Sequence, residues 1–307
     1  MFKHADYFDY NIEGARSNNC ILIDTKNWIA NSSNEIVGYN TRGGILTNYI
    51  TEVLATNIRE DNSCYGLIGV GDIVLLTATA TRVYNSHTFN IPVGYDDIKY
   101  TDIPTTHVIG KFADKKISLP TLKLFNDFVL LQQEDIGTNS TISLVEKNRT
   151  VYKVIRTSDK VESVTEGDVV LVGDNVTTPI TLSGIEYYVI SESLIIALLN
   201  MSVEDKRELT AELIRPLKDY TVYKDYQSEK VYGTTLIAKP EYDETKDEFT
   251  SALYTEDFYE VIESDLDILK EHDIVMVSRA ATNYVTYNGI RYYTTRGKQF
   301  LEARIRR

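Results

Sequence analysis

The sequence predicts a mostly β fold of small barrels, and three observations carry this prediction. Short runs of β-branched and aromatic residues recur along the chain, and turn signals such as Gly43-Gly44 and Ser183-Gly184 separate them. Few segments have the 3.6-residue periodicity of an amphipathic helix. One stretch of the chain also matches a later stretch without a gap, which is typical of a duplicated unit.

The duplicated stretches cover residues 167–190, which read GDVVLVGDNVTTPITLSGIEYYVI, and residues 272–295, which read HDIVMVSRAATNYVTYNGIRYYTT. At this offset Asp168 aligns with Asp273. Both stretches begin with a turn before a β run, and both contain a Ser-Gly or Asn-Gly pair between two β runs. Such pairs favour two-residue hairpin turns, because glycine and asparagine tolerate positive φ angles.

A second shared element lies ahead of each duplicated stretch. Residues 122–130 read LKLFNDFVL, and residues 214–222 read IRPLKDYTV. The first third of the chain has a weaker copy of the pattern, in which Gly71-Asp72 precedes the β run Ile73–Leu76. Residues 77–99 are interpreted as an insertion in this copy. The sequence therefore predicts a whole domain present three times.

One helix is predicted between the second and third copies. Ser202 is a suitable N-cap, Glu204 lies in the first turn, and Pro216 follows the segment Val203 to Glu212. We interpret residues 201–212 as a linker helix. A second candidate, Ser264 to Lys270, is short enough to be only a turn.

The ordered set of motifs resembles the GroES-type co-chaperonins. The third copy has the opening Ile214-Arg215-Pro216-Leu217-Lys218-Asp219, and the second has Gly167-Asp168 before a Val-rich strand and the closing run Ser191 to Leu198. The resemblance implies three tandem GroES-like irregular small β-barrels. The predicted organisation is an N-terminal arm (1–14), a divergent first barrel (15–113, with the insertion at about 77–99), a second barrel (114–200), the linker helix (201–212) and a third barrel (213–307).

Charge and composition exclude several classes of function. The net charge of −13 disfavours a nucleic-acid-binding face. No run of apolar residues is long enough to cross a bilayer, and MFKHADYFDY lacks the apolar core of a signal peptide. Two cysteines are too few for a disulfide framework. Four histidines are isolated from one another in the sequence, so no metal site is expected: His4, His87, His107 and His272. The sequence also lacks a Gly-x-Ser-x-Gly and a Walker motif, so no catalytic residues, no cofactor and no enzyme activity are expected.

In the GroES family, the loop after the first strand binds the chaperonin through an apolar tripeptide preceded by glycines. The resemblance places this role on Gly43-Gly44-Ile45-Leu46, where the competing interpretation is a turn followed by a core strand. Residues 233–237 match loosely, and residues 136–142 have lost the pattern. The family also works as a seven-membered ring, which three unequal barrels do not tile evenly.

We therefore expect a non-enzymatic structural protein of a tailed-phage virion, assembled in the bacterial cytoplasm. In this hypothesis it is a capsid auxiliary, decoration or head-completion component at the head or head–tail connector. Its expected partners are the major capsid protein, other virion proteins or copies of itself. A co-chaperonin that caps a bacterial chaperonin is the alternative, and a cell-surface or receptor-binding β-protein is a third option. The candidate partner-binding residues are Phe2, Tyr7, Phe8, Tyr10, Ile45, Leu46, Arg304, Arg306 and Arg307.

Overall fold

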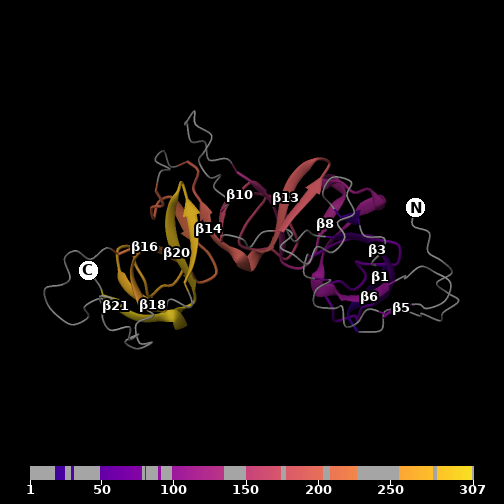
Figure 1. Cartoon of the computed structure of the whole chain (residues 1–307), viewed down its shortest axis with the longest axis horizontal. Helices are drawn as coiled ribbons and strands as arrows, with labels where there is room; N and C mark the ends of the chain where they lie inside the picture. Colours follow the sequence, from indigo (N-terminus) through magenta and orange to yellow (C-terminus); the bar gives the residue numbers. More distant parts are fainter. Residues whose placement is uncertain are drawn as a thin grey trace, which may run out of the picture. The chain divides into compact units, whose positions relative to one another are not determined.

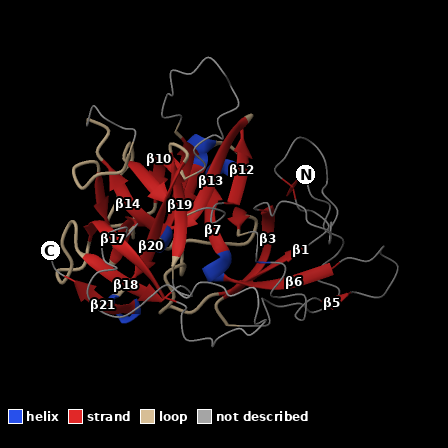
Figure 2. Ribbon diagram, turned by 60° about the vertical axis from the view of Figure 1, so that its left-hand side comes forward, coloured by secondary structure: helices blue, strands red, loops and turns tan. Residues whose placement is uncertain are grey.

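The computed structural model describes residues 18–24, 29–30, 49–77, 80, 89–90, 99–134, 150–173, 178–202, 208–226, 256–278 and 282–305 (Figure 1). These residues form antiparallel strands joined by short turns, as Figure 2 shows by colour. The predicted mostly β class is confirmed for this part of the chain. Several connections between described strands contain 3-10 turns of three residues each: η4 (Thr105–His107), η5 (Ala113–Lys115), η6 (Leu119–Thr121), η7 (Glu192–Leu194) and η9 (Lys298–Phe300).

The described strands form three sheets. The first contains β1 (Cys20–Asp24), β2 (Ile29–Ala30), β3 (Tyr49–Asn57), β4 (Ile73–Leu76), β5 (Phe89–Asn90), β6 (Lys99–Pro104), β7 (Val108–Phe112) and β8 (Leu122–Leu124). The second contains β9 (Phe128–Gln133), β10 (Val151–Thr157), β11 (Val169–Val172), β12 (Thr178–Leu182), β13 (Ile185–Ser191), β14 (Ile195–Leu199) and β15 (Ile214–Pro216). The third contains β16 (Tyr220–Asp225), β17 (Glu256–Ser264), β18 (Ile274–Ser278), β19 (Asn283–Tyr287), β20 (Ile290–Arg296) and β21 (Leu301–Ile305).

The three sheets share one order of strands. The first runs β5-β6-β1-β3-β4-β7-β8, with β2 paired to β3 at the side. The second runs β12-β13-β9-β10-β11-β14-β15, and the third runs β19-β20-β16-β17-β18-β21. In each, the first long strand lies in the middle, and the strand that follows the Gly-Asp or His-Asp turn lies beside the final strand. The sequence duplication is therefore matched by a duplication of topology.

The two hairpin turns predicted from sequence are confirmed. Ser183 and Gly184 have φ angles of 53° and 81°, and Asn288 and Gly289 have φ angles of 50° and 78°. Positive φ at both central residues is the geometry of a type I′ turn, which matches the twist of the strands on either side. The flanking pairs are Leu182 with Ile185 in the second sheet, and Tyr287 with Ile290 in the third.

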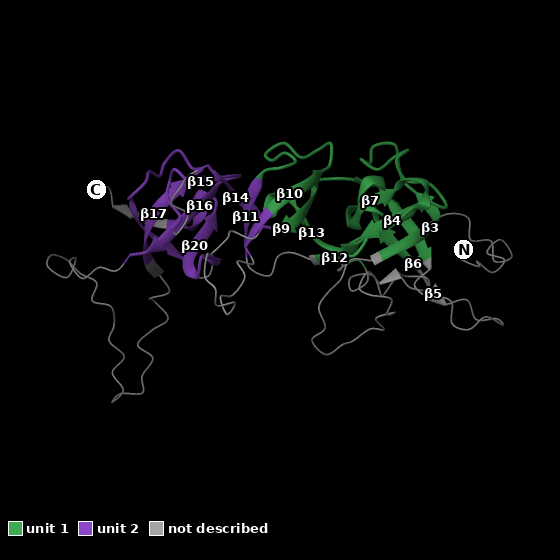
Figure 3. Ribbon diagram, turned by 90° about the horizontal axis from the view of Figure 1, so that it is seen from above, with its two compact units in different colours: residues 1–133, 153–168, 175–194 green, residues 134–152, 169–174, 195–307 purple. Residues whose placement is uncertain are grey.

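The chain divides into two compact units, coloured green and purple in Figure 3. Unit 1 comprises residues 1–133, 153–168 and 175–194, and unit 2 comprises residues 134–152, 169–174 and 195–307. Strands β9, β12 and β13 of the second sheet belong to unit 1, whereas β11, β14 and β15 belong to unit 2. The predicted barrel boundaries at residues 114 and 213 stay a prediction.

The described residues of unit 1 include two hydrophobic core clusters. The run Ile73–Leu76 shows how one strand serves both, because side chains alternate between the two faces of a strand. Ile73 and Leu75 join a cluster with residues of β7, β8, β9, β12 and β13. Val74 and Leu76 join a cluster with Ile21, Ile23, Val53, Cys64, Ile68, Ala80, Ile103, Val108 and Phe125.

The described residues of unit 2 also include two core clusters, and each contains two buried tyrosines. Val222 and Tyr223, which are neighbours in β16, enter different clusters because they lie on opposite faces. The fully buried rings are those of Tyr223, Tyr259 and Tyr287. The Tyr223 hydroxyl lies 2.8 Å from the Thr295 hydroxyl, so this polar tip is satisfied inside the core.

The predicted linker helix is not found in its described part. Residues 203–207 lie outside the described residues, whereas residues 208–212 form a bend and turns. Leu209 and Leu213 are buried in a core cluster of unit 2, and the Leu209 backbone N–H donates to the Tyr292 hydroxyl at 2.9 Å. These tertiary contacts override a weak local helix signal. The candidate helix Ser264 to Lys270 is a strand end followed by a bend and turns.

Candidate protein-interaction site

One local turn is common to all three repeats. In each, the aspartate carboxylate accepts a hydrogen bond from the backbone N–H three residues earlier, and the residue before the aspartate has positive φ. The bonds are Gly69 to Asp72, Thr165 to Asp168 and Lys270 to Asp273, each at 2.8 Å. The φ angles are 82° for Gly71, 98° for Gly167 and 68° for His272. The same turn therefore forms in all three sheets, including the first, where the sequence signal was weakest.

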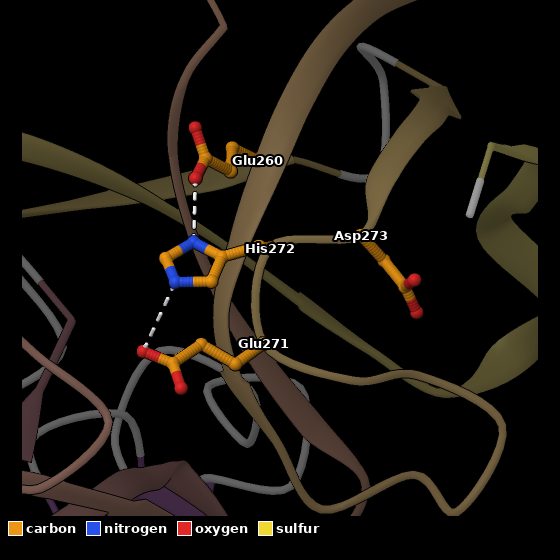
Figure 4. A pocket seen from close by; sticks show the side chains of 4 residues that line it. All are labelled: Glu260, Glu271, His272 and Asp273. Atoms are coloured by element: carbon orange, nitrogen blue, oxygen red, sulfur yellow. Dashed lines mark hydrogen bonds and ion pairs between the residues drawn. The ribbon is translucent and has the colours of Figure 1, made fainter. Parts of the chain in front are cut away.

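His272 occupies the turn position that its alignment with Gly167 predicts. Of the three equivalent turn residues, it is the one that carries a side chain. Its ring lies between two carboxylates, with Nδ1 2.7 Å from Glu260 and Nε2 3.7 Å from Glu271 (Figure 4). The Asp273 carboxylate points away from the ring and caps the turn. The four side chains line a pocket, and Lys224 reaches Glu260 from the neighbouring strand at 3.3 Å.

The Glu260 carboxylate is the electrostatic centre of this pocket. Burial on its own would raise the pKa of Glu260. The hydrogen bond with His272 and the charge of Lys224 outweigh that effect and hold the pKa below its usual value. The carboxylate is therefore ionised at neutral pH and anchors the imidazole. Among the residues that the structure describes, no group of His, Cys, Asp and Glu side chains is arranged to hold a metal ion.

The two thiols are buried and serve packing. Burial, and then the charge of Asp102, raises the pKa of Cys20 to about 11. Burial likewise raises the pKa of Cys64, which packs in a core cluster of unit 1. Both thiols are therefore protonated at neutral pH, a state in which cysteine is a weak nucleophile. His107, whose pKa is lowered by burial, has Nδ1 2.8 Å from the Thr77 hydroxyl.

Of the predicted partner-binding residues, Arg304 falls in the described part of the chain. Arg304 lies on β21 opposite Val275. The other predicted residues lie outside the described part of the chain: Phe2, Tyr7, Phe8, Tyr10, Ile45, Leu46, Arg306 and Arg307. In chain order, Ile45 and Leu46 fall between β1 and β3, and the corresponding connections of the other repeats fall between β9 and β10 and between β16 and β17.

The outer edges of the first two sheets show a mode of contact that sequence reasoning missed. Each edge is covered by a three-residue strand that opens the following repeat. In the first sheet, β8 pairs antiparallel with β7, and Lys123 lies opposite Lys111. In the second, β15 pairs antiparallel with β14, and Arg215 lies opposite Leu198. The sequence signal that could have indicated these added strands is the apolar-x-apolar alternation of Leu122–Leu124 and Ile214–Pro216. In both strands the first and third residues are buried and the middle one is exposed.

A group of exposed apolar side chains lies in the connection between β3 and β4. Tyr65 is 51% exposed, Leu67 37% and Val70 70%. They lie in a segment of turns that leads into the Gly71-Asp72 turn of the first sheet. Several large apolar side chains exposed within six residues are a feature of surfaces that contact other proteins.

Comparisons with known proteins do not assign the chain to a family. No protein-family model matches it, and no curated protein matches it either. Within the described residues, no helix is long and apolar enough to cross a membrane.

Proposed function

We propose that this chain is a non-enzymatic structural protein of a tailed-phage virion, a capsid auxiliary, decoration or head-completion component that binds neighbouring capsid subunits. The observation that carries the proposal is the shared strand order of the three sheets, together with the covering of one sheet's edge by the opening strand of the next repeat. Tandem modules joined in this way present repeated contact surfaces at fixed intervals along one chain.

The finer fold proposal is that each sheet is a GroES-like barrel. Support comes from the order of elements in the second and third sheets, which follows the family pattern: a first strand, a connection, a second strand, the Gly-Asp or His-Asp turn, a strand, a hairpin with Gly, and a final strand. The local geometry agrees with this pattern, since the aspartate of each turn caps its own backbone.

The surface provides two further arguments for a protein partner. The exposed side chains of Tyr65, Leu67 and Val70 are suited to lose water against an apolar surface. The net charge of −13 disfavours phosphate backbones as partners and leaves protein surfaces as the better fit.

The proposal is tested by mass spectrometry of virus particles purified from the host that produces the chain. We expect the chain in intact particles at a constant ratio to the major capsid protein. A chain that is abundant in the lysate but absent from purified particles would overturn the virion proposal.

A binding assay tests the exposed apolar group, with particles that lack the chain as bait. We expect the triple variant Tyr65→Ser, Leu67→Ser, Val70→Ser to lose binding, and Ile185→Ser, another exposed apolar site, to keep it.

The second candidate is a co-chaperonin that caps a bacterial chaperonin. It is favoured by the chain position of Ile45 and Leu46, between the first long strand of the first sheet and its neighbour β3. Size-exclusion chromatography with a bacterial chaperonin, with and without ATP, separates the candidates. Nucleotide-dependent co-elution that Ile45→Ser with Leu46→Ser abolishes would establish the chaperonin as partner, and separate peaks under both conditions would exclude it.

A further inference from the structure

Strands β7, β14 and β21 close the three repeats and are equivalent to one another residue by residue. Each has a register shift against its inner neighbour at the same point, between the third and fourth paired residues. Counted from this shift, the equivalent triplets are Gly110-Lys111-Phe112 in β7, Ala197-Leu198-Leu199 in β14 and Ala303-Arg304-Ile305 in β21. What covers the first two triplets therefore indicates what the third is built to accept.

The first two triplets are covered in the same register. Phe112, Lys111 and Gly110 lie opposite Leu122, Lys123 and Leu124, and Leu199, Leu198 and Ala197 lie opposite Ile214, Arg215 and Pro216. One further backbone bond recurs, from Phe125 N–H to the Ile109 carbonyl at 2.7 Å and from Leu217 N–H to the Ile196 carbonyl at 2.9 Å.

The approach of the added strand is close enough to require a small residue at the first position of the triplet. A Cβ placed on Gly110 would lie 2.3 Å from the Lys123 carbonyl oxygen. The equivalent residues, Ala197 and Ala303, are the next smallest. The third triplet thus keeps the residue size that an added strand needs.

The outer edge of β21 is open in the part of the chain that the structure describes. β21 pairs with β18 and ends the third sheet, and no described strand lies in the place that β8 and β15 occupy. An open edge presents a row of unpaired N–H and C=O groups that favour an additional strand. We propose that the Ala303–Ile305 edge binds residues 8–10 of a second copy of this chain as an antiparallel strand.

The choice of occupant follows from pattern and charge. Residues 8–10 read Phe-Asp-Tyr, which has the apolar-x-apolar alternation of β8 and β15. In the observed register, Asp9 of the second copy is opposite Arg304, and a cross-strand pair of opposite charges stabilises a sheet. Further basic residues, Arg306 and Arg307, follow β21, and the acidic residues Asp6 and Glu13 flank the incoming triplet. Nine residues separate Tyr10 from β1, which gives the segment reach beyond its own first sheet.

Such a contact is head-to-tail, because the donor segment and the acceptor edge are different parts of the chain. A contact of this kind builds open chains or closed rings, not two-fold dimers. The inference rests on the strand registers and not on the virion context. A failure to self-associate would leave the proposed function standing, and absence from virus particles would leave the self-association standing.

The test uses two variants of the full-length chain. Arg304→Pro blocks the acceptor edge. Arg304 lies two residues after Glu302, the equivalent of Ile109 and Ile196, whose carbonyls face the added strand, so alternation directs the Arg304 N–H outward as well. Proline at this position therefore spares the bonds to β18. Deletion of residues 1–12 removes the donor. By light scattering, we expect the wild-type mass to rise with concentration and each variant to be monomeric. In an equal mixture, the donor segment of Arg304→Pro can still bind the intact edge of the deletion variant. We therefore expect a 1:1 dimer.

A charge exchange provides the matched control. Asp9→Arg alone and Arg304→Asp alone are expected to weaken association about fivefold, and the double variant to restore it. Arg304→Ala keeps the outward N–H and is expected to associate within about fivefold of wild type. Any one of three results would overturn the proposal: a wild-type protein that is monomeric at all concentrations, self-association of Arg304→Pro alone or of the deletion variant alone, or a mixture of these two variants that stays monomeric. Folding of each variant is checked by its thermal unfolding curve.

Discussion

Nδ1 of His272 lies 2.7 Å from Oε1 of Glu260, which ties the turn of the third repeat to the strand beside it. The Glu260 side chain is 14% exposed, and its pKa is held below the usual value, against the effect of burial, by His272 and Lys224. A carboxylate whose pKa is lowered in the folded state stabilises the fold above its unfolded pKa. That contribution is lost as the pH falls through the folded pKa.

We predict that Glu260→Gln lowers the free energy of unfolding by about 0.5–1.5 kcal/mol at neutral pH, the size of one hydrogen-bonded charge. Because the pKa of Glu260 is lowered in the folded state from the ordinary glutamate value of 4.5, the difference from wild type is expected to shrink as the pH falls below about that value. Urea unfolding at a series of pH values measures it. Glu271→Gln, at 3.7 Å and 48% exposed, is the control and is expected to change little. If Glu260→Gln lowered the free energy of unfolding by the same amount in acid, the charge of Glu260 would not be the source of the effect.

The Asp168 turn gives a second prediction. Its carboxylate accepts hydrogen bonds from the Thr165 N–H at 2.8 Å and the Thr165 hydroxyl at 3.0 Å, much as an N-cap residue does. We expect Asp168→Ala to cost about 0.5–2 kcal/mol of unfolding free energy, measured by thermal or urea unfolding. The equivalent Asp273 is 5% exposed, so Asp273→Ala is expected to cost at least as much.

The control for these turn variants is Asp159→Ala. Asp159 is 88% exposed and pairs with Lys123 at 3.6 Å, so its removal is expected to stay within about 0.5 kcal/mol of wild type. Equal costs for Asp159→Ala and Asp168→Ala would show that the turn geometry contributes nothing beyond surface charge.

The turns and hairpins were predictable from sequence because they depend on local chemistry. Gly71, Gly167 and the pairs Ser183-Gly184 and Asn288-Gly289 occupy positions where positive φ is required, and few residues meet this requirement at low cost. The duplicated order of strands followed from the spacing of these turns. The predicted linker helix is not found in its described residues 208–212 for the opposite reason: Leu209 and Leu213 gain more from burial in unit 2 than a short helix would provide.

The covered edges and the His272 pocket were not predictable in the same way. The shared element at residues 122–130 was visible, but pairing of β8 with the preceding sheet is a long-range choice that alternation alone does not determine. The pairing of Glu260 with His272 joins a strand to a turn twelve residues later, and it required the register of β17 with β18. In both cases the missing information was strand register.

Close packing of β8 on β7 gives a third prediction. A Cβ on Gly110 would meet the Lys123 carbonyl oxygen at 2.3 Å, and the backbone there has no flexible end that can move aside. We expect Gly110→Ala to lower the free energy of unfolding by about 1–3 kcal/mol and to speed hydrogen exchange of the Phe125 amide, which bonds to Ile109 in the same ladder. Gly69→Ala is the control, since the nearest atom to its Cβ is a side-chain oxygen at 3.9 Å. An unchanged Phe125 exchange rate would argue against this packing.

The last prediction concerns the contact that replaced the expected helix. The Leu209 N–H donates to the Tyr292 hydroxyl at 2.9 Å in a buried environment, and Tyr292 itself is 3% exposed. Tyr292→Phe leaves this N–H without its acceptor, which is expected to cost about 1–3 kcal/mol and to speed hydrogen exchange of the Leu209 amide. Tyr284→Phe removes a hydroxyl from a ring that is 45% exposed and is expected to stay within about 0.5 kcal/mol of wild type. If Tyr292→Phe left both stability and Leu209 exchange unchanged, the bend at residues 208–212 would need another anchor, and Leu209 burial in the core cluster of unit 2 would be the next contact to remove.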